Sequence, residues 1–152
     1  MISKLLATYD CAVSLTLKWL APLVLLLARV IPAIAFFKAG QTKIKNWDST
    51  LYLFEEEYQV PFLPFELAAY MGTAVELLLP PLLLFGLLSR CTSAALFLFN
   101  IVAVISYPVI WGNGFYDHQL WGMMLLVGAI WGPGRLSIDH YLRQFFTKTA
   151  VN

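Results

Sequence analysis

Four residues in the first third of the chain share one helical face, and two of them are cations: Arg29, Phe36, Gly40 and Lys43. Their separations of 7, 4 and 3 residues place them in line at about 100° per residue. A cation at bilayer depth costs at least about 2.5 kcal/mol and normally faces protein, water or a partner. This face therefore indicates the interior of a helical bundle, where Arg29 and Lys43 could bind an anion or a polar head group.

A carboxylate, Glu76, lies deep inside the second long apolar segment. A carboxylate at that depth must be paired or protonated, because an isolated ion is strongly disfavoured in a low dielectric. Ala69, Gly72 and Thr73 precede it on the same face and permit a neighbouring helix to approach closely. We predict an interaction between Arg29 and Glu76, which either fixes the helix register or borders a polar cavity.

His118 and Trp121 lie one helical turn apart in the last apolar segment. Histidine suits proton transfer, metal ligation or a hydrogen bond to a quinone carbonyl, although a lone histidine at a helix end also serves as a capping or packing residue. Asp117 could orient its ring or cap the helix. Trp121 could wall an aromatic pocket or belong to the interfacial aromatic belt. No His, Cys or carboxylate cluster has metal-ligand spacing, so no structural metal is expected.

The composition is that of an integral membrane protein. The chain of 152 residues is 60% hydrophobic and 12% charged, about half the charged fraction of a soluble domain. Its net charge of +1 gives no reason to propose nucleic acid as a partner. We expect one all-α domain, residues 1–152, that forms a four-helix bundle in the lipid bilayer.

Four apolar segments are long enough to cross a bilayer, for which a helix needs about 20 residues. They cover about residues 19–40, 65–88, 91–111 and 116–131. Residues 1–18 are too polar for a signal-peptide core. Their apolar positions recur with the spacing of a helix, which predicts an amphipathic helix on the membrane before the first span.

Two further helices are expected outside the spans. Leu51, Phe54 and Tyr58 recur on one face and predict a short lid helix, with Asp48 or Ser49 as its cap. The segment after Gly132-Pro133-Gly134 predicts a C-terminal interfacial helix, whose basic residues Arg143 and Lys148 would meet lipid phosphate.

The basic residues also predict an orientation. One side would hold Lys4, Lys18, Arg90, Arg135, Arg143 and Lys148, and the other Lys38, Lys43 and Lys45. Because short cytoplasmic loops carry the excess of Lys and Arg, both termini should be cytoplasmic and the lid helix should face the periplasm. The faces of Gly122 and Gly128 could mediate homo-oligomerisation.

Several motifs together resemble those of the DoxX family of small bacterial membrane proteins. The resemblance covers about residues 29–142 and rests on the Arg29 stripe, Glu76 after Gly72, Gly86–Arg90, His118 with Trp121, and Gly132–Asp139. The segment Phe54–Pro61 is similar to DoxX-type proteins encoded beside enzymes that modify cysteines of small secreted copper-binding peptides. The resemblance implies a four-helix inner-membrane protein tied to redox or sulfur metabolism. The family takes its name from the membrane subunit of a thiosulfate:quinone oxidoreductase.

The leading hypothesis is a quinone-linked oxidoreductase component whose site opens towards the periplasmic leaflet. Arg29 and Lys43 would bind a quinone oxygen, Phe36 and Trp121 would line the site, and Glu76 and His118 would handle the proton. A redox partner or a diffusible substrate would supply electrons, since the chain has no flavin, haem or iron–sulfur motif. The main alternative is a non-catalytic membrane anchor or scaffold for peptide-modifying or copper-handling partners. A small-solute or peptide transporter is a third, although no internal repeat is evident.

Overall fold

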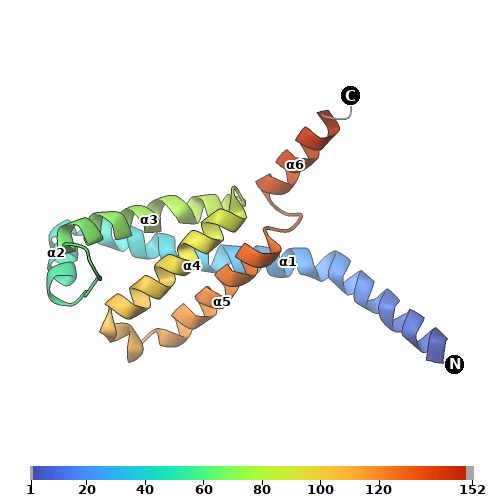
Figure 1. Ribbon diagram of the computed structural model, residues 1–152, viewed down its shortest axis with the longest axis horizontal. Helices are drawn as coiled ribbons and strands as arrows, with labels where there is room; N and C mark the ends of the chain where they lie inside the picture. The colour runs from blue at the N-terminus through green and yellow to red at the C-terminus, as the bar shows by residue number, and fades with distance from the viewer. Residues whose placement is uncertain (1, 150–152) are drawn as a thin grey trace.

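The computed structural model describes residues 2–149, the side chains through residue 147, and this part of the chain is helical with no strand. The elements in order are α1 (Ile2–Lys45), α2 (Trp47–Glu56), α3 (Phe65–Phe85), α4 (Ser89–Ser106), the 3₁₀ turn η1 (Pro108–Trp111), α5 (Phe115–Trp131) and α6 (Ile138–Thr149). The bundle consists of α3, α4, α5 and the second half of α1, with α2 at one end and α6 at the other (Figure 1). The all-α membrane bundle predicted from the sequence is confirmed.

Helix α1 is much longer than the expected first span. Its 44 residues extend about 66 Å, roughly twice the thickness of a hydrocarbon core. The first part projects away from the bundle (Figure 1), and its side chains are exposed. The predicted amphipathic N-terminal helix is therefore the beginning of α1 rather than a separate element before the span.

Small residues set the distances between the bundle helices. A Cβ atom on Gly40 of α1 would lie 2.9 Å from the Glu76 Cβ of α3, and one on Gly128 of α5 would lie 2.6 Å from the Ser93 Oγ of α4. Gly122 faces Asn100 of α4 in the same way, at 3.1 Å. The two α5 glycines expected to serve oligomerisation therefore face α4 of the same chain.

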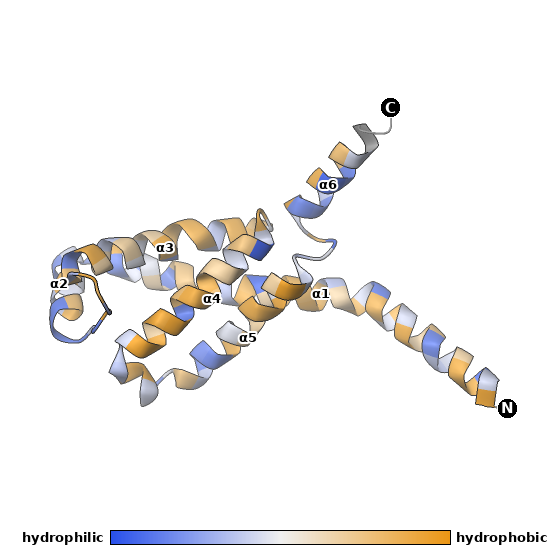
Figure 2. Cartoon of the chain, viewed as in Figure 1, coloured by the Kyte–Doolittle hydropathy of each residue, from blue (hydrophilic) through white to orange (hydrophobic). Residues whose placement is uncertain are grey.

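The outer surface of the bundle is apolar, as a lipid-facing surface must be. Figure 2 shows hydrophobic residues dominating the bundle helices, whereas hydrophilic residues gather at α2 and α6. Within residues 2–149, α1, α3 and α4 are long and apolar enough to cross a membrane. Helix α5 has 17 residues, at the lower limit of about 17 to 25 for a span.

Two predicted element boundaries were wrong. The expected third span to residue 111 ends at Ser106, because Tyr107 is extended before Pro108, a position that disfavours the helical conformation. The lid helix begins earlier than expected: the Asn46 side chain, not Asp48 or Ser49, caps α2 by accepting a hydrogen bond of 3.1 Å from the Ser49 N–H.

Candidate functional site

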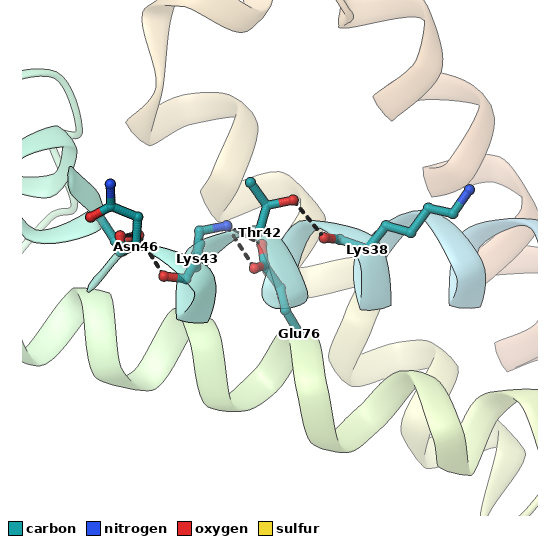
Figure 3. Close-up of polar contacts among 6 residues, drawn as sticks. Lys38, Thr42, Lys43, Asn46 and Glu76 are labelled. Carbon is teal, nitrogen blue, oxygen red and sulfur yellow. Dashed lines mark hydrogen bonds and ion pairs between the residues drawn. The ribbon is translucent and has the colours of Figure 1, made fainter. Parts of the chain in front are cut away.

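The buried carboxylate has a different partner from the one predicted. The Lys43 ammonium of α1 donates hydrogen bonds to both carboxylate oxygens of Glu76 in α3, at 2.6 and 2.8 Å. Figure 3 shows the two side chains facing each other, with Lys38 pointing away from them. The predicted contact between Arg29 and Glu76 is wrong, because Arg29 lies 14 residues before Lys43, about 21 Å along the helix axis.

Asn100 of α4 orients the imidazole ring of His118. The Asn100 Nδ2 donates to the His118 backbone carbonyl at 2.9 Å, and this fixes which way the amide points. The Asn100 Oδ1 therefore lies 2.8 Å from the His118 Nδ1, and because this oxygen can only accept, Nδ1 carries the proton. In the neutral ring, Nε2 is then the proton-accepting atom. Asn100 thus joins α4 to α5 through hydrogen bonds.

Aromatic rings surround His118. The Phe36 ring packs edge-on against Phe99, Trp121 and His118, with centroid distances of 6.0, 5.8 and 6.5 Å. The Trp121 and His118 rings are 4.9 Å apart. Trp111 and Tyr116, two other aromatic residues near the start of α5, are exposed instead. The aromatic wall is therefore assembled from α1, α4 and α5 together.

A cavity of about 380 Å³ joins the ion pair to this aromatic cluster. Lys43, Glu76 and His118 line it, and so do the predicted Phe36 and Trp121. Arg29, the remaining predicted site residue, is not in its lining. The wall is otherwise mostly apolar, which is typical of a site for a lipophilic molecule with a few polar atoms.

Ser106 contributes a polar group to this cavity that the sequence did not single out. Its side chain is 1% exposed, and its Oγ has no hydrogen-bond partner in the described part of the chain. A buried hydroxyl without a partner costs about 1 to 3 kcal/mol. A ligand oxygen in the cavity is a suitable acceptor for this hydroxyl.

The lid closes the cavity through stacked rings and a backbone hydrogen bond. The Tyr58 ring, just after α2, lies 4.3 Å from both the Phe54 and the Tyr107 rings and nearly parallel to each. The Gln59 N–H donates to the Ser106 carbonyl at 2.7 Å, which fastens the segment after α2 to the end of α4. Burial, followed by the charge of Glu76, raises the pKa of Tyr58 well above its ordinary value.

Comparison with known proteins places the chain in a family. The model of the DoxX family matches residues 24–108, which include Lys43, Glu76 and the lid. The chain belongs to the DoxX family. The cavity residues His118 and Trp121 lie beyond the matched range.

An uncharacterized protein of Haemophilus influenzae is 27% identical to this DoxX protein over 131 residues, covering 80% of this chain and 85% of the relative. No solved structure gives a significant match. Family membership and the apolar helices together establish a membrane protein.

Arg29 of this DoxX protein belongs to a different centre, at the α6 end of the bundle. Its guanidinium donates to the backbone carbonyls of Pro133 and Leu136, at 3.2 and 2.5 Å. Gly86, with φ of +71°, lies against it, since an added Cβ would meet the Arg29 Nη1. Arg29 therefore holds the loop after α5 and is not part of the cavity.

Asp139 completes this second centre, which we call the latch. Its carboxylate accepts hydrogen bonds from the N–H groups of Leu88 and Ser89 at 2.9 and 2.8 Å, and its own N–H donates to the Gly86 carbonyl. The latch thus comprises Arg29, the Gly86–Ser89 turn and the Pro133–Asp139 segment. The motif residues that carry the family resemblance divide between the latch and the cavity.

Proposed function

We propose that this protein is a quinone-linked component of a membrane oxidoreductase and that the cavity under the lid binds the quinone ring. The observation that carries the proposal is the convergence of Lys43, Glu76 and His118 in one mostly apolar, aromatic-walled cavity. Its volume of about 380 Å³ falls within the range of about 300 to 1,000 Å³ for small-molecule sites.

The polar groups of the cavity suit a flat molecule with carbonyl oxygens. The Lys43 ammonium and the unpartnered Ser106 hydroxyl are donors for such oxygens, and Phe36 and Trp121 offer faces or edges for ring packing. A bound quinone would supply the acceptor for two electrons and two protons. The donor of those electrons would be a redox partner protein or a diffusible sulfur compound.

His118 and Glu76 would handle the accompanying protons. His118 presents Nε2 as its proton-accepting atom, since Asn100 holds the proton on Nδ1. Because quinone reduction takes up protons, His118 would accept a proton at Nε2 and pass it to a quinone oxygen, and Glu76, paired with Lys43 in the resting site, would in its protonated form donate the other. In this arrangement Lys43 orients the ligand, while His118 and Glu76 move protons.

Binding is tested with the tryptophan that lines the cavity. The purified full-length protein is titrated with a short-chain ubiquinone, and quenching of tryptophan fluorescence is recorded. Trp121→Phe should remove most of the saturable quenching, whereas Trp111→Phe, at an exposed site outside the cavity, should retain it. Equal saturable quenching in both variants would place the quinone elsewhere.

Turnover is tested in membranes with Glu76→Gln and His118→Ala. Loss of a positioned acid–base group lowers a rate by about 10² to 10⁴, so both variants should reduce quinone at least about 100-fold more slowly. If both variants were present as intact protein and reduced quinone at the wild-type rate, proton transfer by Glu76 and His118 would be contradicted. Stoichiometric co-purification of a peptide-modifying or copper-handling partner, without saturable quinone binding, would favour the anchor or scaffold instead.

The proposed setting is the bacterial inner membrane, with both termini in the cytoplasm and the lid towards the periplasm. The arrangement of charges supports it: Arg90, Arg135 and Arg143 lie around the α6 end, whereas Lys43 and Lys45 lie at the α2 end. Since short cytoplasmic loops carry the excess of arginine and lysine, the α6 end is the proposed cytoplasmic end.

A further inference from the structure

Three arginines surround a second depression, at the end of the bundle opposite the lid. Arg90 comes from the start of α4, Arg135 from the loop after α5, and Arg143 from α6, and together they line a hollow of about 260 Å³. Elements far apart in the sequence therefore bring guanidinium groups to one place. We call this hollow the arginine cup.

The latch determines where these arginines lie. Asp139 is fixed to the α3–α4 turn by three hydrogen bonds, two from the N–H groups of Leu88 and Ser89 and one to the Gly86 carbonyl. Arg143 follows Asp139 by four residues and so shares its helix face. A Cβ atom on Gly132 would lie 3.1 Å from the Arg90 Nε, so glycine at this position leaves room for the Arg90 side chain against the loop.

The arginine cup carries excess positive charge, since three arginines and one carboxylate, Asp139, line it. Both Asp139 oxygens accept hydrogen bonds from backbone N–H groups, so the carboxylate is held by the turn and not by the cup arginines. Within the described part of the chain, none of the three cup arginines forms an ion pair or a side-chain hydrogen bond. The planar guanidinium group suits the oxygens of phosphate, to which it can donate two parallel hydrogen bonds.

An apolar groove adjoins the arginine cup and shares Arg90, Asp139 and Arg143 with it. The groove has a volume of about 690 Å³, and its other side chains include Leu88, Leu142 and Phe146. These three apolar side chains are 41% to 65% exposed. A basic cup continuous with an apolar groove, at the end of a membrane-spanning bundle, matches the head and one chain of a lipid.

We propose that the arginine cup binds the phosphate of an anionic phospholipid, with an acyl chain in the groove of Leu88, Leu142 and Phe146. This is a defined site built by α4, the loop after α5 and α6, and it goes beyond general adhesion of α6 to the membrane. Through the latch, the bound lipid would hold the first turn of α6 at the end of the bundle. The site is independent of the cavity under the lid and of the function proposed for it.

The first test measures lipid binding to the full-length protein in detergent by native mass spectrometry. Phosphatidylglycerol should bind, and phosphatidylcholine, which has no net charge, should bind at least about 10-fold more weakly. Arg90→Gln/Arg143→Gln should weaken phosphatidylglycerol binding roughly 30-fold, the factor expected for two lost guanidinium–head group attractions. Lys38→Gln/Lys45→Gln removes the same charge from exposed positions near the lid and should leave binding unchanged.

Three outcomes overturn the proposal. Equal binding of the two lipids would mean that no anionic head group is selected. Equal weakening by both double variants would mean that the effect comes from overall charge. If inorganic phosphate bound at the cup and the lipid did not, the arginines would form a site for a free anion and not for a lipid.

A second test uses the two native cysteines. Cys91 lines the groove, whereas Cys11 is exposed on the projecting part of α1. Phosphatidylglycerol should slow alkylation of Cys91 by a water-soluble maleimide at least about 10-fold and leave Cys11 unaffected. The protection should disappear in Arg90→Gln/Arg143→Gln. Equal protection of both cysteines, or protection that survives in the variant, would contradict a lipid in this groove.

Discussion

At the scale of single residues, the cavity depends on one ion pair whose members need each other. Glu76 is 5% exposed, and the Lys43 ammonium engages both of its oxygens. Removing either side chain alone should destabilise the protein, because the remaining partner becomes an uncompensated charge away from water. The contribution of the pair to folding stability can therefore be measured separately from its role in ligand binding.

We therefore predict that Glu76→Leu lowers the free energy of unfolding by about 3 kcal/mol, while Lys43→Met/Glu76→Leu recovers most of that loss. The single variant buries an unpaired ammonium, whereas the double variant replaces both charges with apolar groups. Unfolding in mixed micelles with increasing SDS measures this. Lys45→Met, at an exposed position two residues away, should change stability by no more than about 0.5 kcal/mol. A double variant as unstable as the single one would show that the pair itself contributes the stability.

At the scale of elements, the latch joins α1, the α3–α4 turn and the start of α6. Arg29 satisfies the carbonyls of Pro133 and Leu136, and Asp139 satisfies the first N–H groups of α4. Charged hydrogen bonds of this kind contribute about 1.5 to 3 kcal/mol each. The latch thus explains the buried arginine without assigning it to ligand binding.

We predict that Arg29→Met destabilises the loop after α5 and α6 but leaves quinone quenching unchanged. The cost should be about 2 to 3 kcal/mol, because two carbonyls lose a charged donor. Faster proteolysis and amide exchange within residues 132–147 would report it. Lys18→Met, which removes a cation from an exposed position on the same helix, serves as the control. If the variant lost quinone binding while the α6 region stayed intact, Arg29 would be a ligand-binding residue.

At the scale of the whole molecule, the lid couples the ends of α2 and α4. The rings of Phe54, Tyr58 and Tyr107 form a continuous stack, and the Gln59 N–H bond holds the chain beside it. Because burial raises the pKa of Tyr58, its hydroxyl stays neutral in the closed state beyond the ordinary value of 10.0. The ring thus contributes to closure as an uncharged group at physiological pH.

We predict that Tyr58→Ala speeds dissociation of a bound quinone by about 10-fold, since two stacked pairs at about 0.5 to 1.5 kcal/mol each are lost. Tyr58→Phe should keep the slow rate. The folded pKa is raised, so the contribution of Tyr58 is fully present below about pH 10 and is lost as pH rises further. Stopped-flow quenching between pH 6 and 11 should show faster release only at the alkaline end, and not in Tyr58→Phe. Equally fast release from the Phe variant would contradict a role for stacking.

The sequence by itself determined the helical class, the approximate positions of the long apolar segments, and the interior faces of the helices. These features can be predicted from short stretches of sequence, because a helix turns once every 3.6 residues and apolar residues at that spacing mark one face. Five of the residues selected from their types, including Glu76 and His118, line one cavity.

Only the tertiary structure decided which cation meets Glu76 and which residues close the cavity. Arg29 and Lys43 share one helical face, so angular periodicity cannot distinguish them; the axial register of α1 against α3, set where Gly40 admits the Glu76 Cβ, selects Lys43. The stack of Tyr58 on Tyr107 and the meeting of Arg90 with Arg143 join residues about 50 apart in the chain. Such contacts depend on how whole helices pack, and no local repeat in the sequence records that packing.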